Sequence, residues 1–189
     1  MSSIPPIPPI TPNDETASLA DIQFSAADVS AILRQHSWHT TDFTPEQSAW
    51  CQHAAALLGP QSPNHAALES LLGLVFHYDA KEILAQVDAH LTLSRYAARE
   101  ALRELATQLL DPAPLTPDRF NAVIDAMKTN LDIRGRELFL TIRLALAGRS
   151  GQGDLDRVIL LLDKAAAANF STPVKSARIR IIGFCSALD

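Results

Sequence analysis

The chain has 189 residues, of which 47% are hydrophobic and 6% aromatic, and its formal net charge is −5. Apolar runs such as Val158 to Leu162 are too short for a bilayer-spanning helix of roughly 20 residues, and the N-terminus lacks the basic, apolar and small-residue layout of a secretory signal. Two cysteines without a recognisable spacing exclude a disulfide scaffold, so we expect a soluble protein of the cytoplasm without membrane contact.

Charge is distributed unevenly along the chain. Residues 1–80 hold one basic residue against eight acidic ones, a net charge of −7, whereas residues 81–189 hold fifteen basic and thirteen acidic residues, a net of +2. The basic excess is strongest from Lys128 to Arg149, where five basic residues stand against two acidic ones. This patch permits nucleic-acid binding without establishing it, and the acidic first half is a candidate surface for a protein partner.

Prolines dominate the first residues, which read IPPIPPITP from Ile4 to Pro12. Each proline lacks a backbone donor and restricts the residue before it, so this stretch is not helical. The sequence predicts a flexible tail over residues 1–22, with a ligand for a proline-recognition domain as the alternative. Beyond it we expect a helical region of no recognised relationship over residues 23–70 and a second helical region over residues 71–189.

Helix boundaries are legible from about residue 26 onward. Threonine can cap the free N–H groups of a first turn and proline is tolerated at the first helical position, so each Thr-Pro pair predicts a helix start. These pairs are Thr44-Pro45, Thr116-Pro117 and Thr172-Pro173. Gln47, three residues after Thr44, also predicts a capping box. Helix ends are expected at Gly59-Pro60, at Asp111-Pro112 and at Gly148.

Between these boundaries apolar residues recur three and four positions apart, which is the period of an amphipathic helix. Five segments show it: Ile83, Val87 and Leu91 after a start near Asp79; Leu102, Leu105 and Leu109; Phe120, Ile124 and Met127; Leu138, Ile142 and Ala145; and Leu155, Val158, Ile159 and Leu162. No segment alternates convincingly with the period of two that a half-buried strand needs. The sequence therefore predicts an all-α fold, a bundle of seven or so short helices.

Two groups of residues resemble reactive or ligand-binding sites. His36, His39, Cys51 and His53 offer zinc-binding atoms, but their spacing matches no common finger, and interleaved Trp38 and Trp50 favour a hydrophobic core instead. The glycine-rich stretch 148–153 lacks the Gly-Lys-Ser/Thr ending of a phosphate loop and follows a helix, so a helix-to-helix turn with positive φ angles is the better interpretation. Without a nucleophile motif either, we expect no catalytic residue, no metal and no cofactor.

The stretch from Gly135 to Arg149 reads GRELFLTIRLALAGR and resembles the C-terminal signature of bacterial glutamyl-tRNA synthetases, approximately G-K-x-L-F-x-P-L-R-x-A-L-T-G-R. Weaker likeness continues in the segments 76–81, 115–120 and 154–162, so that the resemblance covers roughly residues 70–168. It implies the helical fold of that family's anticodon-binding domain. Nothing in the chain resembles the family's nucleotide-binding motifs, so we expect a free-standing, truncated paralogue that does not charge tRNA.

The resemblance also suggests where RNA would bind. In the family, the signature arginine and the loop after it lie beside the anticodon loop, which implies Arg143, Gln152 and Leu155 as counterparts here. With the basic residues of the surrounding patch, the predicted RNA-binding set is Arg134, Arg136, Arg143, Arg149, Gln152 and Leu155. Thr141, Ala147 and the 151–153 loop depart from the family pattern and put anticodon specificity in doubt. Alternatively, Arg143 pairs with a carboxylate between helices.

Three functions remain compatible with these observations. The first is a non-catalytic tRNA-binding or RNA-binding module. The second is a protein-interaction module that reuses the helical scaffold without RNA, since fold does not carry function with it; it predicts an exposed apolar patch. The third is an enzyme of unrelated chemistry built around His36, His39, Cys51 and His53.

Overall fold

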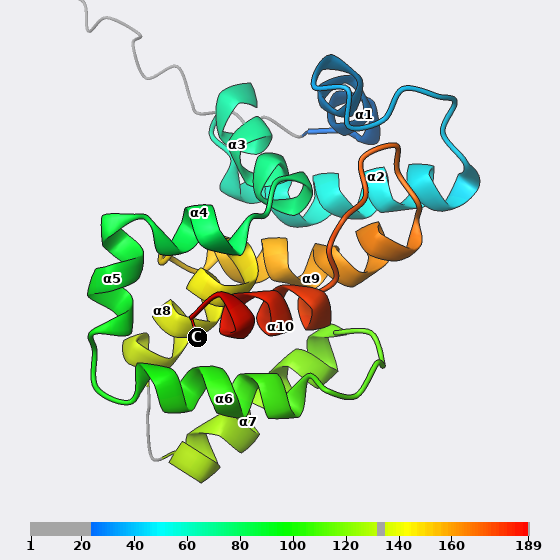
Figure 1. The fold of residues 1–189 in the computed structure, drawn as a ribbon. Helices are drawn as coiled ribbons and strands as arrows, with labels where there is room; N and C mark the ends of the chain where they lie inside the picture. Colours follow the sequence, from blue (N-terminus) through cyan, green and yellow to red (C-terminus); the bar gives the residue numbers. More distant parts are fainter. Residues whose placement is uncertain (1–23, 132–134, 189) are drawn as a thin grey trace, which may run out of the picture.

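The computed structural model describes residues 24–131 and 135–188, and in these ranges all regular structure is helical (Figure 1). The α-helices are α1 (Ala26–Gln35), α2 (Pro45–Leu58), α3 (His65–Phe76), α4 (Ala80–Leu84), α5 (Val87–Leu93), α6 (Ala98–Gln108), α7 (Pro117–Leu131), α8 (Arg136–Ala147), α9 (Asp154–Ala167) and α10 (Ala177–Leu188), with a 3-10 turn, η1 (Gly59–Gln61), after α2. The all-α prediction is confirmed. Every helix in these two ranges falls short of the length and apolarity that a membrane crossing needs.

Local capping explains where α2 and α7 start. Helix α2 begins at Pro45, and the Thr44 hydroxyl and the Gln47 side chain form the reciprocal hydrogen bonds of the predicted capping box. Helix α7 likewise begins at Pro117, where the Thr116 hydroxyl accepts a hydrogen bond from the Arg119 N–H at 3.3 Å. Two of the three Thr-Pro predictions are therefore confirmed.

The third Thr-Pro pair does not start a helix. Thr172 and Pro173 lie in a connecting segment, and α10 begins only at Ala177. The N–H of Ala177 donates at 2.8 Å to the carboxylate of Asp163, whose other oxygen accepts from the Leu115 N–H at 2.6 Å. Asp163 belongs to α9, so this contact is distant in sequence, and it adds to a local cap in which the Ser176 hydroxyl accepts from the Ile179 N–H at 3.4 Å.

The helix predicted from Asp79 through Leu91 is broken in the structure. Asp79 caps a single turn, α4, and the backbone becomes extended at Gln86 (φ −80°, ψ 144°) before α5 begins. Ile83 is buried at 6% exposure, whereas Val87 and Leu91 are 72% and 59% exposed. The prediction that these three residues share one buried face is wrong, because after the break α5 packs on the core through Ala89 and Thr92 and leaves Val87 and Leu91 exposed.

Helix α9 runs through the middle of the molecule (Figure 1). Helices α2 and α3 pack against one side of it, α8 packs beside it, and α10 covers α4, α6 and α8. The buried hydrophobic residues form one continuous cluster that extends from Phe24 to Phe184. The N-terminal helices and the later ones therefore share one core.

Helix α8, which carries the signature, is buried on most of its surface. Eight of its twelve residues are buried, and these include Leu138, Ile142 and Ala145 as the periodicity predicts. A helix that is apolar nearly all round belongs in the interior of a protein. Most of the signature is therefore explained by packing, independently of any contact with RNA.

A buried arginine ties the ends of two helices together. Arg180 on α10 is 0% exposed and donates hydrogen bonds to four backbone carbonyls, those of Leu74, Val75, Leu146 and Lys175. Three of these carbonyls belong to the last turns of α3 and α8, where a helix has no partner of its own for them. Burial lowers the pKa of Arg180 to about 10, which still leaves the guanidinium charged at neutral pH.

Tyr78 completes this arrangement from the segment between α3 and α4. Its ring lies 4.5 Å from the Arg180 guanidinium carbon, and its hydroxyl donates to the carbonyl of Ala145 in the last turn of α8. Burial raises the pKa of the Tyr78 hydroxyl, so it remains a donor. Tyr78 and Arg180 together cap the buried end of the signature helix.

Candidate nucleic-acid interface

The signature arginine is part of an ion pair between helices. Arg143 Nε and Nη2 each lie 2.7 Å from an oxygen of Asp156, and Nη1 donates to the Gly151 carbonyl at 2.9 Å. The Arg143 side chain is 12% exposed and its guanidinium carbon lies 5.0 Å from the centre of the Phe139 ring. Of the two interpretations of Arg143, the structure contains the pairing between helices, which leaves little of the guanidinium to meet a ligand.

The loop after the signature helix is held from two sides. Gly148 ends α8 with a φ of +81°, as predicted for a helix-to-helix turn, whereas Gly153 has an ordinary φ of −67°. A Cβ atom on Gly151 would lie 2.7 Å from Leu155 Cδ1, so the loop passes directly over the leucine. Arg143 fixes the same loop through the Gly151 carbonyl. The conformation of residues 149–153 therefore depends on these core contacts.

The predicted RNA-binding residues fall into different environments. Arg136 and Arg149 are exposed, Gln152 is exposed in the loop, and Leu155 is buried at 4% exposure; Arg134 lies outside the described residues. Arg149 donates one hydrogen bond, to the Ser70 hydroxyl at 3.4 Å. Arg136 starts α8, where a positive charge opposes the helix dipole and brings the fold no stability.

The basic patch from Lys128 to Arg149 is weaker in the structure than its number of basic residues suggests. Lys128 pairs with Asp125 at 3.0 Å, and Arg143 pairs with Asp156. Arg136 and Arg149 remain without a carboxylate partner among the described residues, and they lie near opposite ends of α8, a helix roughly 18 Å long. Within the described part of the patch, Arg136 and Arg149 are thus separated cations rather than parts of a dense basic face.

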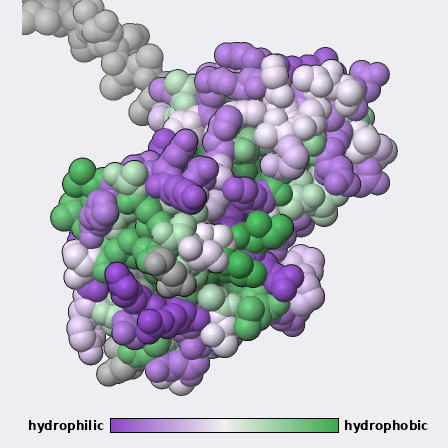
Figure 2. Space-filling model, viewed as in Figure 1, coloured by the Kyte–Doolittle hydropathy of each residue, from purple (hydrophilic) through white to green (hydrophobic). Residues whose placement is uncertain are grey.

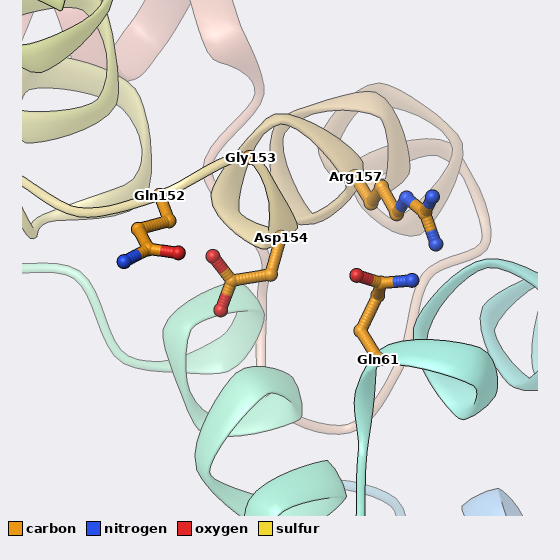
Figure 3. A pocket seen from close by; sticks show the side chains of 5 residues that line it. All are labelled: Gln61, Gln152, Gly153, Asp154 and Arg157. Carbon is orange, nitrogen blue, oxygen red and sulfur yellow. The ribbon is translucent and has the colours of Figure 1, made fainter.

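A polar pocket of about 500 Å³ opens beside this loop (Figure 3). It is lined by Gln61 of η1, by Gln152 and Gly153 of the loop, and by Asp154 and Arg157 of α9. Sequence reasoning missed Gln61, Asp154 and Arg157. Gln61 lies far upstream, in the region without recognised resemblance, so no local signal indicates that it meets the loop.

Arg149 and Asp156, the partner of Arg143, face different depressions. Arg149 lines a groove of about 380 Å³ with Tyr78 and Glu82, and Asp156 lines a third of about 410 Å³ with Lys128 and Phe139. The predicted set is therefore divided along the edge formed by α8, the loop and the start of α9. It forms an elongated surface and no single concave site.

Of the residues in the zinc and enzyme interpretations, His36 and His39 contact aromatic rings and Cys51 belongs to the buried core. Among residues 24–131 and 135–188 no three His, Cys, Asp or Glu side chains come together as a metal site would require. His36 lies 2.7 Å from a Glu69 oxygen and stacks on Trp38, which is buried together with Trp50, as the core interpretation predicts. Burial raises the pKa of Cys51 to about 12, so its thiol stays protonated and a poor nucleophile at neutral pH.

Comparison with known proteins relates the chain to bacterial glutamate–tRNA ligases. It is 28% identical over 127 residues to the glutamate–tRNA ligase of Bacillus subtilis (strain 168), which covers 67% of this chain and 26% of that protein. The ligase of Bacillus pumilus (strain SAFR-032) is 28% identical over 163 residues, 83% of this chain and 32% of the ligase. The chain thus spans a quarter to a third of the length of these curated relatives. No solved structure matches it significantly.

The family model described as the anticodon binding domain matches residues 24–169. This range is more than half of the chain, and it includes α1 to α3 as well as the signature helix and the loop after it. The match therefore extends the relationship upstream of the residues that carry the sequence resemblance. The chain belongs to the anticodon binding domain family.

Proposed function

We propose that this chain is a non-catalytic tRNA-binding module that contacts RNA along the edge formed by α8, residues 148–153 and the start of α9. The observation that carries the proposal is the family match over residues 24–169, which contains this whole edge. Residues 70–168 resemble the anticodon-binding part of glutamyl-tRNA synthetase, and nothing in the sequence resembles that family's nucleotide-binding motifs. Ligase activity is therefore not part of the proposed function.

The geometry suggests separate roles for the predicted residues. Arg136, Arg149 and Gln152 are exposed and are proposed to contact RNA directly. Arg143 is proposed to hold the loop in place through Asp156 and the Gly151 carbonyl, as a positioning residue. Leu155 supports the loop from the core.

Replacing both Arg136 and Arg149 with alanine should weaken tRNA binding about tenfold at a salt concentration of roughly 50 mM. Each cation that contacts a phosphate releases a counterion, so the slope of log affinity against log salt should also become shallower by roughly 1.5. Fluorescence anisotropy with labelled tRNA, at several salt concentrations, measures both quantities.

The matched control replaces Arg99 and Arg103, two exposed arginines one turn apart on α6, with alanine. It removes the same charge from a helix that packs against α8 but lies outside the proposed edge, so the affinity should change less than about twofold if RNA contacts that edge specifically. Equal weakening by both double variants would indicate general charge attraction and would contradict a defined RNA surface.

An exposed apolar surface favours a second candidate function, a protein-interaction module. Val87 and Leu91 on α5 are 72% and 59% exposed, and Ile179 and Ile182 on α10 are 55% and 41% exposed. Figure 2 shows hydrophobic surface over α5 and α10 on one face of the molecule. Contiguous apolar patches of this kind are typical of protein contacts. These helices lie after residue 80, outside the acidic first half that the sequence suggested as a partner surface.

A further inference from the structure

The pocket between η1 and the start of α9 contains polar side chains whose hydrogen-bonding capacity is unused. In the part of the chain that the structure describes, the side chains of Gln61, Gln152 and Asp154 make no hydrogen bond or ion pair. Arg157 donates from Nη1 to the Leu57 carbonyl at 3.2 Å, which orients the guanidinium and leaves its Nε and Nη2 donors available. These side chains come from three different segments and line one space (Figure 3).

Asp154 differs in this respect from its neighbour Asp156, although both lie in the first turn of α9. Both oxygens of Asp156 are committed to Arg143, at 2.7 Å each. Both oxygens of Asp154 remain available, and its half-buried side chain lines the pocket. A pair of free carboxylate oxygens accepts two adjacent donors, which is a specific requirement on a ligand.

Asp154 and Arg157 lie three positions apart on α9, so their Cβ atoms are separated by roughly 5–6 Å. A ligand that satisfies both must offer two adjacent donors to the carboxylate and acceptors to the guanidinium. Guanine offers N1–H and its 2-amino group as adjacent donors and offers O6 and N7 as adjacent acceptors, with O6 next to N1–H. Adenine and cytosine each have a single exocyclic amine, and uracil has a single ring N–H, so none of them offers two adjacent donors.

We propose that this pocket binds an unpaired guanine of a single-stranded RNA loop, with Asp154 accepting from N1–H and the 2-amino group and Arg157 donating to O6 or N7. Gln61 and Gln152 also line the pocket, where their amides can bond the remaining polar atoms of the nucleotide. This inference rests on the proposed RNA-binding function. A phosphate alone is a poor ligand here, because the Asp154 carboxylate repels it.

Inosine tests the assignment because it is guanosine without the 2-amino group. We would measure the affinity of fluorescently labelled RNA hairpins whose seven-nucleotide uridine loops contain one guanosine, one inosine or one adenosine. Wild-type protein should bind the guanosine loop about tenfold more tightly than the inosine loop, since a bidentate base contact contributes about 1–3 kcal/mol of discrimination. The adenosine loop should bind no better than the inosine loop.

Asp154→Asn separates base recognition from general charge effects. It replaces one acceptor oxygen with a donor, so the preference for guanosine over inosine should fall below about threefold. It also removes a negative charge beside the RNA, so the adenosine loop should bind slightly more tightly. Asp88→Asn, an exposed first-turn carboxylate on α5, is the control and should leave the guanosine preference unchanged.

The outcomes distinguish this inference from the function on which it rests. If the wild-type protein binds all three hairpins with equal affinity, the guanine site is wrong while RNA binding stands. If Asp154→Asn and Asp88→Asn shift the three affinities alike, Asp154 does not read the base and the inference is overturned. If no hairpin binds at roughly 50 mM salt, both the guanine site and the proposed function fail.

Discussion

Replacing Arg180 with leucine should lower the free energy of unfolding by about 4 kcal/mol, the largest effect expected for any single side chain in this protein. Leucine fills part of the volume but leaves the carbonyls of Leu74, Val75 and Leu146 buried without their donor. Each unsatisfied buried acceptor is costly because it has given up water without regaining a hydrogen bond. Urea unfolding followed by far-UV circular dichroism measures the change.

Two further variants make this result interpretable. Arg180→Lys keeps the charge but cannot reach several carbonyls with one ammonium group, so it should recover less than half of the lost stability. Arg178→Leu, two residues away on the exposed side of α10, should change stability by less than about 0.5 kcal/mol. An Arg180→Leu protein with an unchanged urea midpoint would show that Arg180 does not hold the ends of α3 and α8.

Replacing Arg143 with alanine should cost about 2 kcal/mol of stability and release the loop that follows α8. The pair with Asp156 is bidentate and only 12% and 23% exposed, so removing one partner leaves the other charge poorly solvated. Hydrogen exchange should accelerate at the amides of residues 149–155, because Arg143 no longer holds the Gly151 carbonyl. Urea unfolding and amide exchange measured by mass spectrometry report the two effects.

A double-mutant cycle isolates the pair itself. Combining Arg143→Ala with Asp156→Ala should cost less than the sum of the single changes, with a coupling energy of about 1.5 kcal/mol. Arg95 and Glu137 form a comparable but more exposed pair, 41% and 44% exposed, whose coupling should stay below about 0.5 kcal/mol. Equal coupling in the two cycles, or unchanged exchange in the loop, would contradict a positioning role for Arg143.

The parts of the fold that depend on local chemistry were predictable from the sequence. The start of α2 follows from Thr44, Pro45 and Gln47, which lie within four residues of one another. The apolar spacing in α6 to α9 also predicts buried faces correctly, because an amphipathic helix has to bury its apolar stripe wherever it packs. The end of α8 at Gly148 follows from the left-handed conformation that glycine adopts readily.

What the sequence could not show depends on partners far apart in the chain. Asp163 accepts a hydrogen bond from the Ala177 N–H at the start of α10, and Arg180 reaches the ends of α3 and α8. The break between α4 and α5 is likewise not visible in the sequence. The apolar spacing continues past Gln86, although the backbone becomes extended there. Such pairings are fixed only when the helices assemble, so propensity and periodicity do not specify them.

The candidate site was predictable only in outline. Resemblance to a synthetase signature points to α8 and the loop after it, but eight of the twelve α8 residues are buried and serve the core. From the resemblance alone, Arg143 is a candidate ligand-binding arginine. In the structure its Nε and Nη2 both donate to Asp156 of α9. Gln61 enters the site only because η1 packs beside the loop.

The most direct test of the central claim is to locate the RNA-binding surface in solution. We would titrate an RNA stem-loop carrying the anticodon of glutamate tRNA into ¹⁵N-labelled protein and follow amide chemical shifts at roughly 50 and 150 mM salt. RNA binding along the proposed edge predicts shifts at residues 148–157 and at Arg136 that diminish at the higher salt. Absence of shifts at the lower salt, or shifts confined to α5 and α10, would contradict it.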